Sequence, residues 1–230
     1  MDVAHPYAAD SARLQLLYRL PTAPAPQRLL IVSRQPGDAL LGQGWPGQVT
    51  VAGLVGLDDL LGAGAGRFDA VALPAVLGVC DIRLPGAHPP IGNRLMLATV
   101  ARLLVPGGTV VGHMDHGWAL RRVMQGAGLR DLACGWRQPD AIRNPRACLR
   151  LLASTGFSAA ECFYVQPNID APMGLIPSHP VAAKAQFLRA IRSSEGAYSR
   201  AGHGLRLLMA LVGLGGSFQS HLFFWARKPC

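Results

Sequence analysis

Short apolar runs spaced along the chain constrain its fold more than any other feature. The first run, residues 29–32, contains no polar residue, which is typical of a strand buried on both faces of a parallel sheet. Segments with apolar residues at helical spacing separate this run from the later ones. Strands that alternate with helices predict an α/β fold with right-handed crossovers, in which helices cover both faces of the sheet.

The same reading gives the expected elements along the chain. Strands are expected at residues 29–32, 48–52, 69–73, 109–112, 162–165 and 222–226. Helices are expected at residues 11–20, 38–43, 56–62, 92–104, 117–126 and 145–155. Two further helices, at about 180–193 and 199–213, fall in a proline-containing interval that we interpret as an insertion, about 167–219, before the last strand. Residues 1–27 are expected to form an N-terminal helix and a proline-rich linker, and 28–230 one domain.

Composition narrows the class of protein. The chain has 22 Lys and Arg against 13 Asp and Glu, a net charge of +9, but its arginines are scattered and form no aromatic-interleaved basic stripe. This disfavours nucleic acid and leaves a GC-rich genome, an anionic substrate or an acidic partner as explanations. We expect no membrane span and no secretion signal. Five cysteines without CxxC spacing favour a reduced, cytoplasmic compartment and no metal site.

Three segments carry a resemblance to a known family. Residues 28–38, 68–74 and 103–111 look, in that order, like the first, fourth and fifth strands of a class I S-adenosylmethionine (SAM)-dependent methyltransferase. Residues 153–157 and 221–228 resemble the approach to its sixth strand and its closing antiparallel strand. The resemblance covers most of residues 28–228. It implies a doubly wound, mostly parallel seven-stranded sheet of the Rossmann-like methyltransferase fold.

The glycine loop of that family is largely altered here. The family's first strand is usually followed by Gly-x-Gly-x-Gly, which lets the backbone approach the cofactor. In this chain only Pro36-Gly37 matches, and Arg34 would set a cation beside a cationic sulfonium unless it turns outward. The second strand, ending near residues 51–54, lacks the usual ribose-binding acid. The resemblance implies SAM contacts from Ser33, Gln35, Gly37, Asp38, Gly53 and Pro74.

The most chemically suggestive cluster is His113, Asp115 and His116, at the end of the fifth strand of the family pattern. A histidine there can accept a proton from a hydroxyl or carboxyl substrate while a carboxylate orients its ring. One alternative is that these are loop residues whose side chains hydrogen-bond to backbone groups or water. Another is a metal site, for which three potential ligands on one loop are a weak signal. Substrate contacts are predicted from His5, Tyr7, Gln166 and Asn168, although His5 and Tyr7 also fit a surface tail.

Two functions compete on this sequence. One is methylation of a small molecule, on oxygen, in secondary metabolism or cell-envelope assembly. The other is a catalytically inactive methyltransferase-like subunit or scaffold that has lost SAM and binds a partner protein. Nucleic-acid modification ranks third, because residues 73–76 read Leu-Pro-Ala-Val instead of an Asn/Asp-Pro-Pro-aromatic motif. Four apolar residues recur at helical spacing near the end of the chain: Leu205, Leu208, Met209 and Val212. This pattern predicts core positions or a dimer contact more than a face that lies on a membrane.

Overall fold

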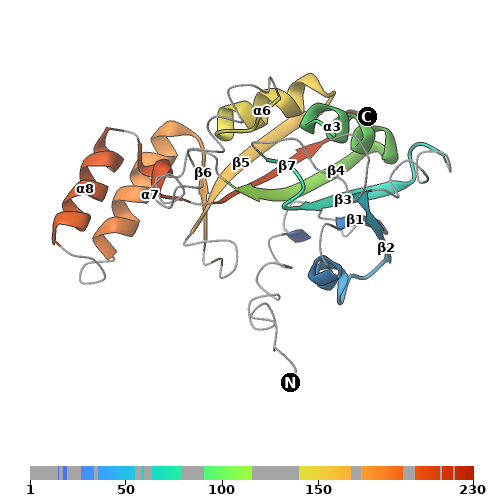
Figure 1. The fold of residues 1–230 in the computed structure, drawn as a ribbon, viewed down its shortest axis with the longest axis horizontal. Helices are drawn as coiled ribbons and strands as arrows, with labels where there is room; N and C mark the ends of the chain where they lie inside the picture. The colour runs from blue at the N-terminus through green and yellow to red at the C-terminus, as the bar shows by residue number, and fades with distance from the viewer. Residues whose placement is uncertain are drawn as a thin grey trace.

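A seven-stranded sheet organises the chain in a computed structural model (Figure 1). The structure describes residues 15, 18–19, 27–33, 36–54, 59, 64–78, 91–115, 140–166, 172, 174–193, 200–212, 214–219 and 221–230. The strands are β1 (Arg28–Ser33), β2 (Gln48–Gly53), β3 (Phe68–Pro74), β4 (Leu104–Asp115), β5 (Ser158–Gln166), β6 (Gly174–Pro177) and β7 (His221–Arg227). The helical elements are η2 (Pro36–Gly42), α3 (Asn93–Leu103), α6 (Pro145–Ser154), α7 (Pro180–Ser193), α8 (Arg200–Leu211) and η4 (Gly215–Phe218).

The strands lie in the order β2-β1-β3-β4-β7-β5-β6. Pairing is parallel from β2 through β4, whereas β7 runs antiparallel to both β4 and β5, and β6 runs antiparallel to β5. Strands β1 to β5 therefore share one direction, which confirms the predicted mostly parallel sheet. The first four end at Ser33, Gly53, Pro74 and Asp115. We call the edge of the sheet formed by these four residues the carboxyl edge.

Both faces of β1 are covered, as its apolar sequence requires. Leu30 and Val32 belong to a core cluster that includes α3 and α6, which lie together on one side of the sheet in Figure 1. Leu29 and Ile31 belong to a second cluster on the opposite face, completed by Tyr18, Leu41 and Trp45. All four β1 residues are at most 2% exposed. This strand therefore carries a layer of side chains on each side.

Helix α3 ends within one residue of its predicted end, but the strand that follows it begins earlier than predicted. The predicted helix covers residues 92–104 and α3 covers Asn93–Leu103, whereas the strand predicted at 109–112 already begins at Leu104. Pro106 explains the difference, because it has no amide hydrogen and disfavours helical backbone at the residue before it. Gly107 then adopts a left-handed φ of 74° and donates its amide to the carbonyl of Lys228 at 3.1 Å.

Two other predictions need correction. The expected helix at 38–43 is the 3-10 helix η2. Strand β6 was not predicted from the sequence. Strand β6 has only four residues, Gly-Leu-Ile-Pro, and its proline suits an edge strand. The remaining expected strands are confirmed, as are the helices at 145–155, 180–193 and 199–213. The helices expected at 56–62 and 117–126 lie outside the described residues, apart from Asp59, which is helical.

Helix α6 begins at a well-formed cap. The side chain of Asn144 accepts a hydrogen bond from the amide of Ala147 at 2.9 Å, and Pro145 occupies the first turn. Both residues suit a helix start, because the cap satisfies a free amide and proline removes another. The helix buries Cys148, Leu151 and Leu152 against the sheet.

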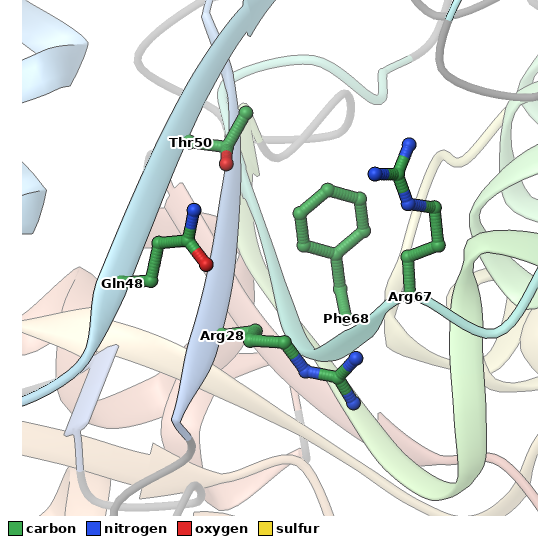
Figure 2. Close-up of a pocket in the computed structure, with 5 residues that line it drawn as sticks. All are labelled: Arg28, Gln48, Thr50, Arg67 and Phe68. Atoms are coloured by element: carbon green, nitrogen blue, oxygen red, sulfur yellow. The ribbon is translucent and has the colours of Figure 1, made fainter. Parts of the chain in front are cut away.

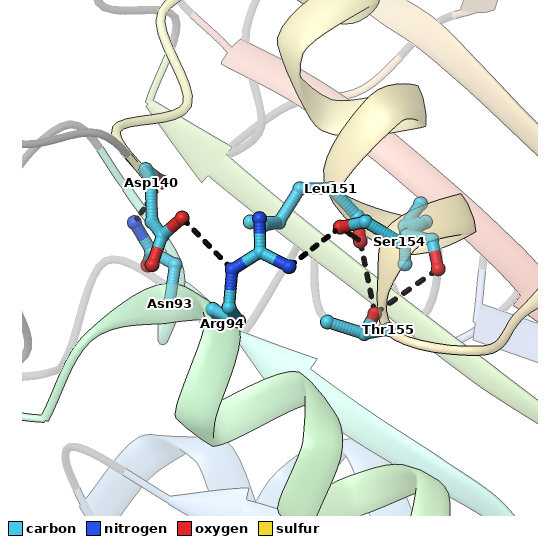
Figure 3. Close-up of polar contacts among 7 residues, drawn as sticks. Asn93, Arg94, Asp140, Leu151, Ser154 and Thr155 are labelled. Carbon is cyan, nitrogen blue, oxygen red and sulfur yellow. Dashed lines mark hydrogen bonds and ion pairs between the residues drawn. The ribbon is translucent and has the colours of Figure 1, made fainter.

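Asn93 joins three parts of the fold at the start of α3. Its side-chain amide donates to the carbonyls of Gly78 at 2.7 Å and Asp140 at 3.1 Å, and its oxygen accepts from the Gly78 amide at 3.2 Å. The residue is 1% exposed. The neighbouring Arg94 reaches from Asp140 to Ser154 of α6 at the surface (Figure 3).

Asn93→Ala should lower the free energy of unfolding by about 2–4 kcal/mol, because it leaves buried backbone groups without partners. Arg94→Ala is the matched control. It removes contacts of a half-exposed ion pair, and we expect a loss within about 1 kcal/mol. Urea unfolding followed by circular dichroism measures both changes, and equal losses would contradict the role given to Asn93.

Candidate functional site

Four polar side chains gather near the carboxyl edge. Tyr18, Asp38 and His113 are 2%, 6% and 8% exposed, and Ser33 is half-buried at the end of β1. We call these four residues the polar cluster. Buried polar groups are costly unless they are hydrogen-bonded. The hydrogen bonds and protonation states of these four side chains therefore determine the chemistry available at this edge.

Tyr18 and His113 form the centre of the cluster. The Tyr18 hydroxyl lies 2.7 Å from Nδ1 of His113, and the two rings meet edge to face with centroids 6.0 Å apart. Phe223 of β7 closes the other side of the phenol ring, at 5.7 Å. Next to Tyr18, Arg19 stacks on Trp45 and donates to the carbonyl of Gln43 at 2.9 Å. These contacts fasten a segment of the N-terminal region onto the sheet.

Burial sets the protonation of the two rings. It lowers the pKa of His113 to about 3, with a further contribution from the nearby His221. Burial also raises the pKa of Tyr18 well above its usual range, and the carboxylate of Asp38 adds to that effect. Both rings are therefore neutral near pH 7, because desolvation disfavours the charged form of each.

Asp38 ties the turn after β1. The hydroxyl of Ser33 donates to Oδ2 of Asp38 at 3.4 Å, and Asp38 lies in the first turn of η2. The carboxylate of Asp38 also contributes to the raised pKa of Tyr18. One buried acid thus links the end of β1 to the first turn of η2.

The structure brings together several residues predicted to contact SAM. Ser33 and Gly53 pair across β1 and β2, and Pro74 ends the strand on the other side of β1. Gly53 is exposed, and no atom lies within 4 Å of the position that a Cβ would occupy there, so the end of β2 is open to solvent. Gly37 lies in η2 beside Asp38. Gln35 lies outside the described residues.

The described residues among the predicted catalytic and substrate-binding groups lie on two strands that are not neighbours. His113 lies within β4 opposite Pro74, and Asp115 ends β4 opposite His221. Gln166 ends β5, two strand positions away from β4. His5, Tyr7, His116 and Asn168 lie outside the described residues. The catalytic and substrate roles of all these residues stay predictions.

Sequence reasoning did not find Tyr18 as a site residue. It assigned the residue to a helix, and the described positions 15, 18 and 19 are helical. The contact with His113 spans 95 residues, however, so no local pattern signals it. Among the described residues no group of three His, Cys, Asp or Glu side chains could hold a metal ion.

A pocket of about 200 Å³ lies at the opposite edge of the sheet, where β1, β2 and β3 begin (Figure 2). It is lined by Arg28, Gln48, Thr50, Arg67 and Phe68. Arg28 is already paired with Asp69 at 3.0 Å, and its guanidinium lowers the pKa of the Asp69 carboxyl group. Open α/β sheets bind their ligands at the carboxyl ends of the strands. The candidate site is therefore the carboxyl edge and not this pocket.

Several solved structures with the same architecture are SAM-dependent methyltransferases. One from Archaeoglobus fulgidus matches with a TM-score of 0.56 and 10% identity, over 96% of this chain and 94% of its own. Phosphoethanolamine N-methyltransferase 2 of Haemonchus contortus, in complex with phosphomonomethylethanolamine and S-adenosylhomocysteine, matches with a TM-score of 0.50 and 15% identity. That match covers 95% of this chain and 53% of the nematode enzyme, so the chain spans about half of its length. The same enzyme in complex with SAM gives a TM-score of 0.50.

No protein-family model matches the sequence, and no curated protein matches it. At identities of 10–16% the structural likeness establishes the fold. The predicted Rossmann-like methyltransferase fold is therefore confirmed. None of the helices in the described part of the chain is long and apolar enough to cross a membrane.

The low pKa of His113 predicts how stability depends on pH. Unfolded His113 takes up a proton below its ordinary pKa of 6.5, whereas folded His113 stays neutral down to about 3. The free energy of unfolding should therefore fall by about 2 kcal/mol between about pH 7 and pH 5 on account of this residue. His113→Asn should remove that part of the pH dependence. His179→Asn, at an exposed position, should keep it.

Chemical denaturation at a series of pH values measures these differences. A wild-type curve that parallels the His113→Asn curve would show that His113 titrates normally in the folded protein.

Proposed function

We propose that this chain binds SAM at its carboxyl edge and transfers the methyl group to an oxygen atom of a small anionic molecule. The observation that supports this most directly is the arrangement of three strand ends. Ser33, Gly53 and Pro74 end adjacent parallel strands, in a fold whose neighbours hold SAM or S-adenosylhomocysteine. That edge is where ligands bind in open α/β sheets.

The residues at this edge fit SAM through a different set of groups from the usual one. The open space beside Gly53 can admit the nucleoside at the end of β2. Asp38 is the one carboxylate in the polar cluster, and we assign it the hydroxyl-binding role that an acid at the end of β2 normally fills. Ser33 and the backbone at Gly37 would hold the amino-acid part. Bound there, SAM would supply a methyl group on a positively charged sulfur.

The protonation of the site favours an anionic nucleophile. Neutral His113, with its pKa near 3, is a weak base at neutral pH, whereas efficient general bases have a pKa near the working pH. A carboxylate, or the phenolate of an acidic phenol, needs no such base, because its oxygen has already lost its proton. The chain then has only to hold that oxygen in line with the methyl group. A net charge of +9 also attracts such substrates.

A second function is favoured by one feature of the site. The described end of β2, at Ala52, Gly53 and Leu54, offers no carboxylate for the ribose, and Asp38 is already engaged by Ser33. A chain that lacks the ribose contact can keep the fold and lose the cofactor. In that case the protein serves as a methyltransferase-like subunit or scaffold for a partner protein.

Calorimetric titration of SAM and S-adenosylhomocysteine into the purified chain separates the two functions. We expect saturable binding that Gly53→Phe abolishes by filling the open space and that Asp38→Asn weakens about tenfold, the loss of one charged hydrogen bond. Glu161→Gln removes a charge at an exposed position of β5 and should bind as the wild type does. Absence of binding at millimolar concentrations of either ligand would favour the scaffold function.

Release of S-adenosylhomocysteine in the presence of small carboxylic acids, phenols and neutral alcohols then tests the nucleophile. We expect turnover with the acids and a rate that is flat on the alkaline side of the substrate pKa. Turnover only with neutral alcohols would contradict the anionic-nucleophile proposal while leaving SAM binding intact.

A further inference from the structure

Helices α7 and α8 form a separate layer beyond the last strand of the sheet. Their contact with β6 is a small core made by Ile176, Ala183, Phe187 and Ala210, all at most 7% exposed. In Figure 1 the two helices lie at one end of the molecule, outside β6. Strands β4 and β6 are three strand positions apart, or about 14 Å. This layer is therefore remote from the β1 side of the carboxyl edge.

The outward surface of α8 is apolar. Leu205, Leu208, Leu211 and Val212 are 49%, 57%, 48% and 60% exposed. They recur at helical spacing and form one stripe, which we call the α8 leucine face. A helix on the surface of a globular protein normally turns polar residues outward. The sequence predicts a core position or a dimer contact for Leu205, Leu208 and Val212. All three are exposed in the single folded chain, so they are not core.

The helical layer that carries this face, α7 and α8, is almost entirely positive in charge. Between Gly174 and Leu214 the chain has five Lys and Arg residues and a single acidic residue, Glu195. Lys184 and Arg189 are exposed on α7. A second copy of the chain would bring like charges together at such an interface. An anionic surface, in contrast, complements both the charge and the apolar stripe.

We infer that the α8 leucine face lies in the interfacial region of an anionic lipid bilayer. Helices that bind bilayer surfaces combine an apolar stripe with Lys and Arg at their flanks, and they bind through apolar burial plus attraction to acidic headgroups. The convex outer surface of a helix enters the headgroup region without needing a shaped groove. This assignment does not depend on the methyltransferase proposal, because it rests on α7 and α8 alone.

Co-sedimentation of the full chain with vesicles tests the inference. The vesicles are phosphatidylcholine alone, or phosphatidylcholine mixed with phosphatidylglycerol. The wild type should bind the mixed vesicles and not the neutral ones, and high salt should weaken binding, because surface charges are screened. The double variant Leu205→Ser/Leu208→Ser should lower the partition coefficient about tenfold or more by removing buried apolar area. Lys184→Glu/Arg189→Glu should lower it as well.

Leu95→Ser is the matched control, because Leu95 is 61% exposed on α3, away from this layer. It should bind vesicles as the wild type does, and circular dichroism should show that every variant is folded. Failure of the wild type to bind mixed vesicles at low salt would overturn the inference, as would equal binding by the Leu205→Ser/Leu208→Ser variant. Sedimentation velocity that shows a dimer broken by that variant, without vesicle binding, would assign the face to a second copy instead.

Discussion

The burial of β1 on both faces is the constraint on which the rest of the structure depends. Four consecutive apolar residues cannot be hidden by one layer, so the chain must supply side chains above and below them. Helices α3 and α6 cover one face, and Tyr18, η2 and Trp45 cover the other. The second cover brings Tyr18 against His113, so the polar cluster is a consequence of how the first strand is enclosed.

Local patterns in the sequence predict an element well where the spacing of apolar residues and the flanking proline and glycine residues indicate the same bounds. Helices α7 and α8 are predicted nearly to the residue, because proline and glycine bracket them and their apolar residues recur at helical spacing. Strand β6 is missed, since four residues are too few to show a period. The start of β4 is misplaced because Gly107-Gly108 suggests a turn between helix and strand, whereas the strand runs through both glycines.

The candidate site is less predictable than the fold. The resemblance brings Ser33, Gly53 and Pro74 to one edge, since strand order alone determines where strand ends meet. It does not predict that His113 is buried beneath a tyrosine from the N-terminal region, because that contact joins residues far apart in sequence. Nor does it predict the neutrality of the imidazole, which arises from desolvation in the folded chain. The chemistry of the site is therefore determined by tertiary packing.

The central position of β7 has a consequence for how the chain is assembled. This strand is synthesised after the other six, yet it lies between β4 and β5 and provides the only hydrogen-bonded link between them within the described sheet. Without β7, the pairings of β1 to β4 and of β5 with β6 would be two separate sheet fragments, each with an unpaired inner edge. Exposed strand edges pair readily with other chains. Because β7 pairs with both inner edges, its addition covers two strand edges that would otherwise be open to other chains.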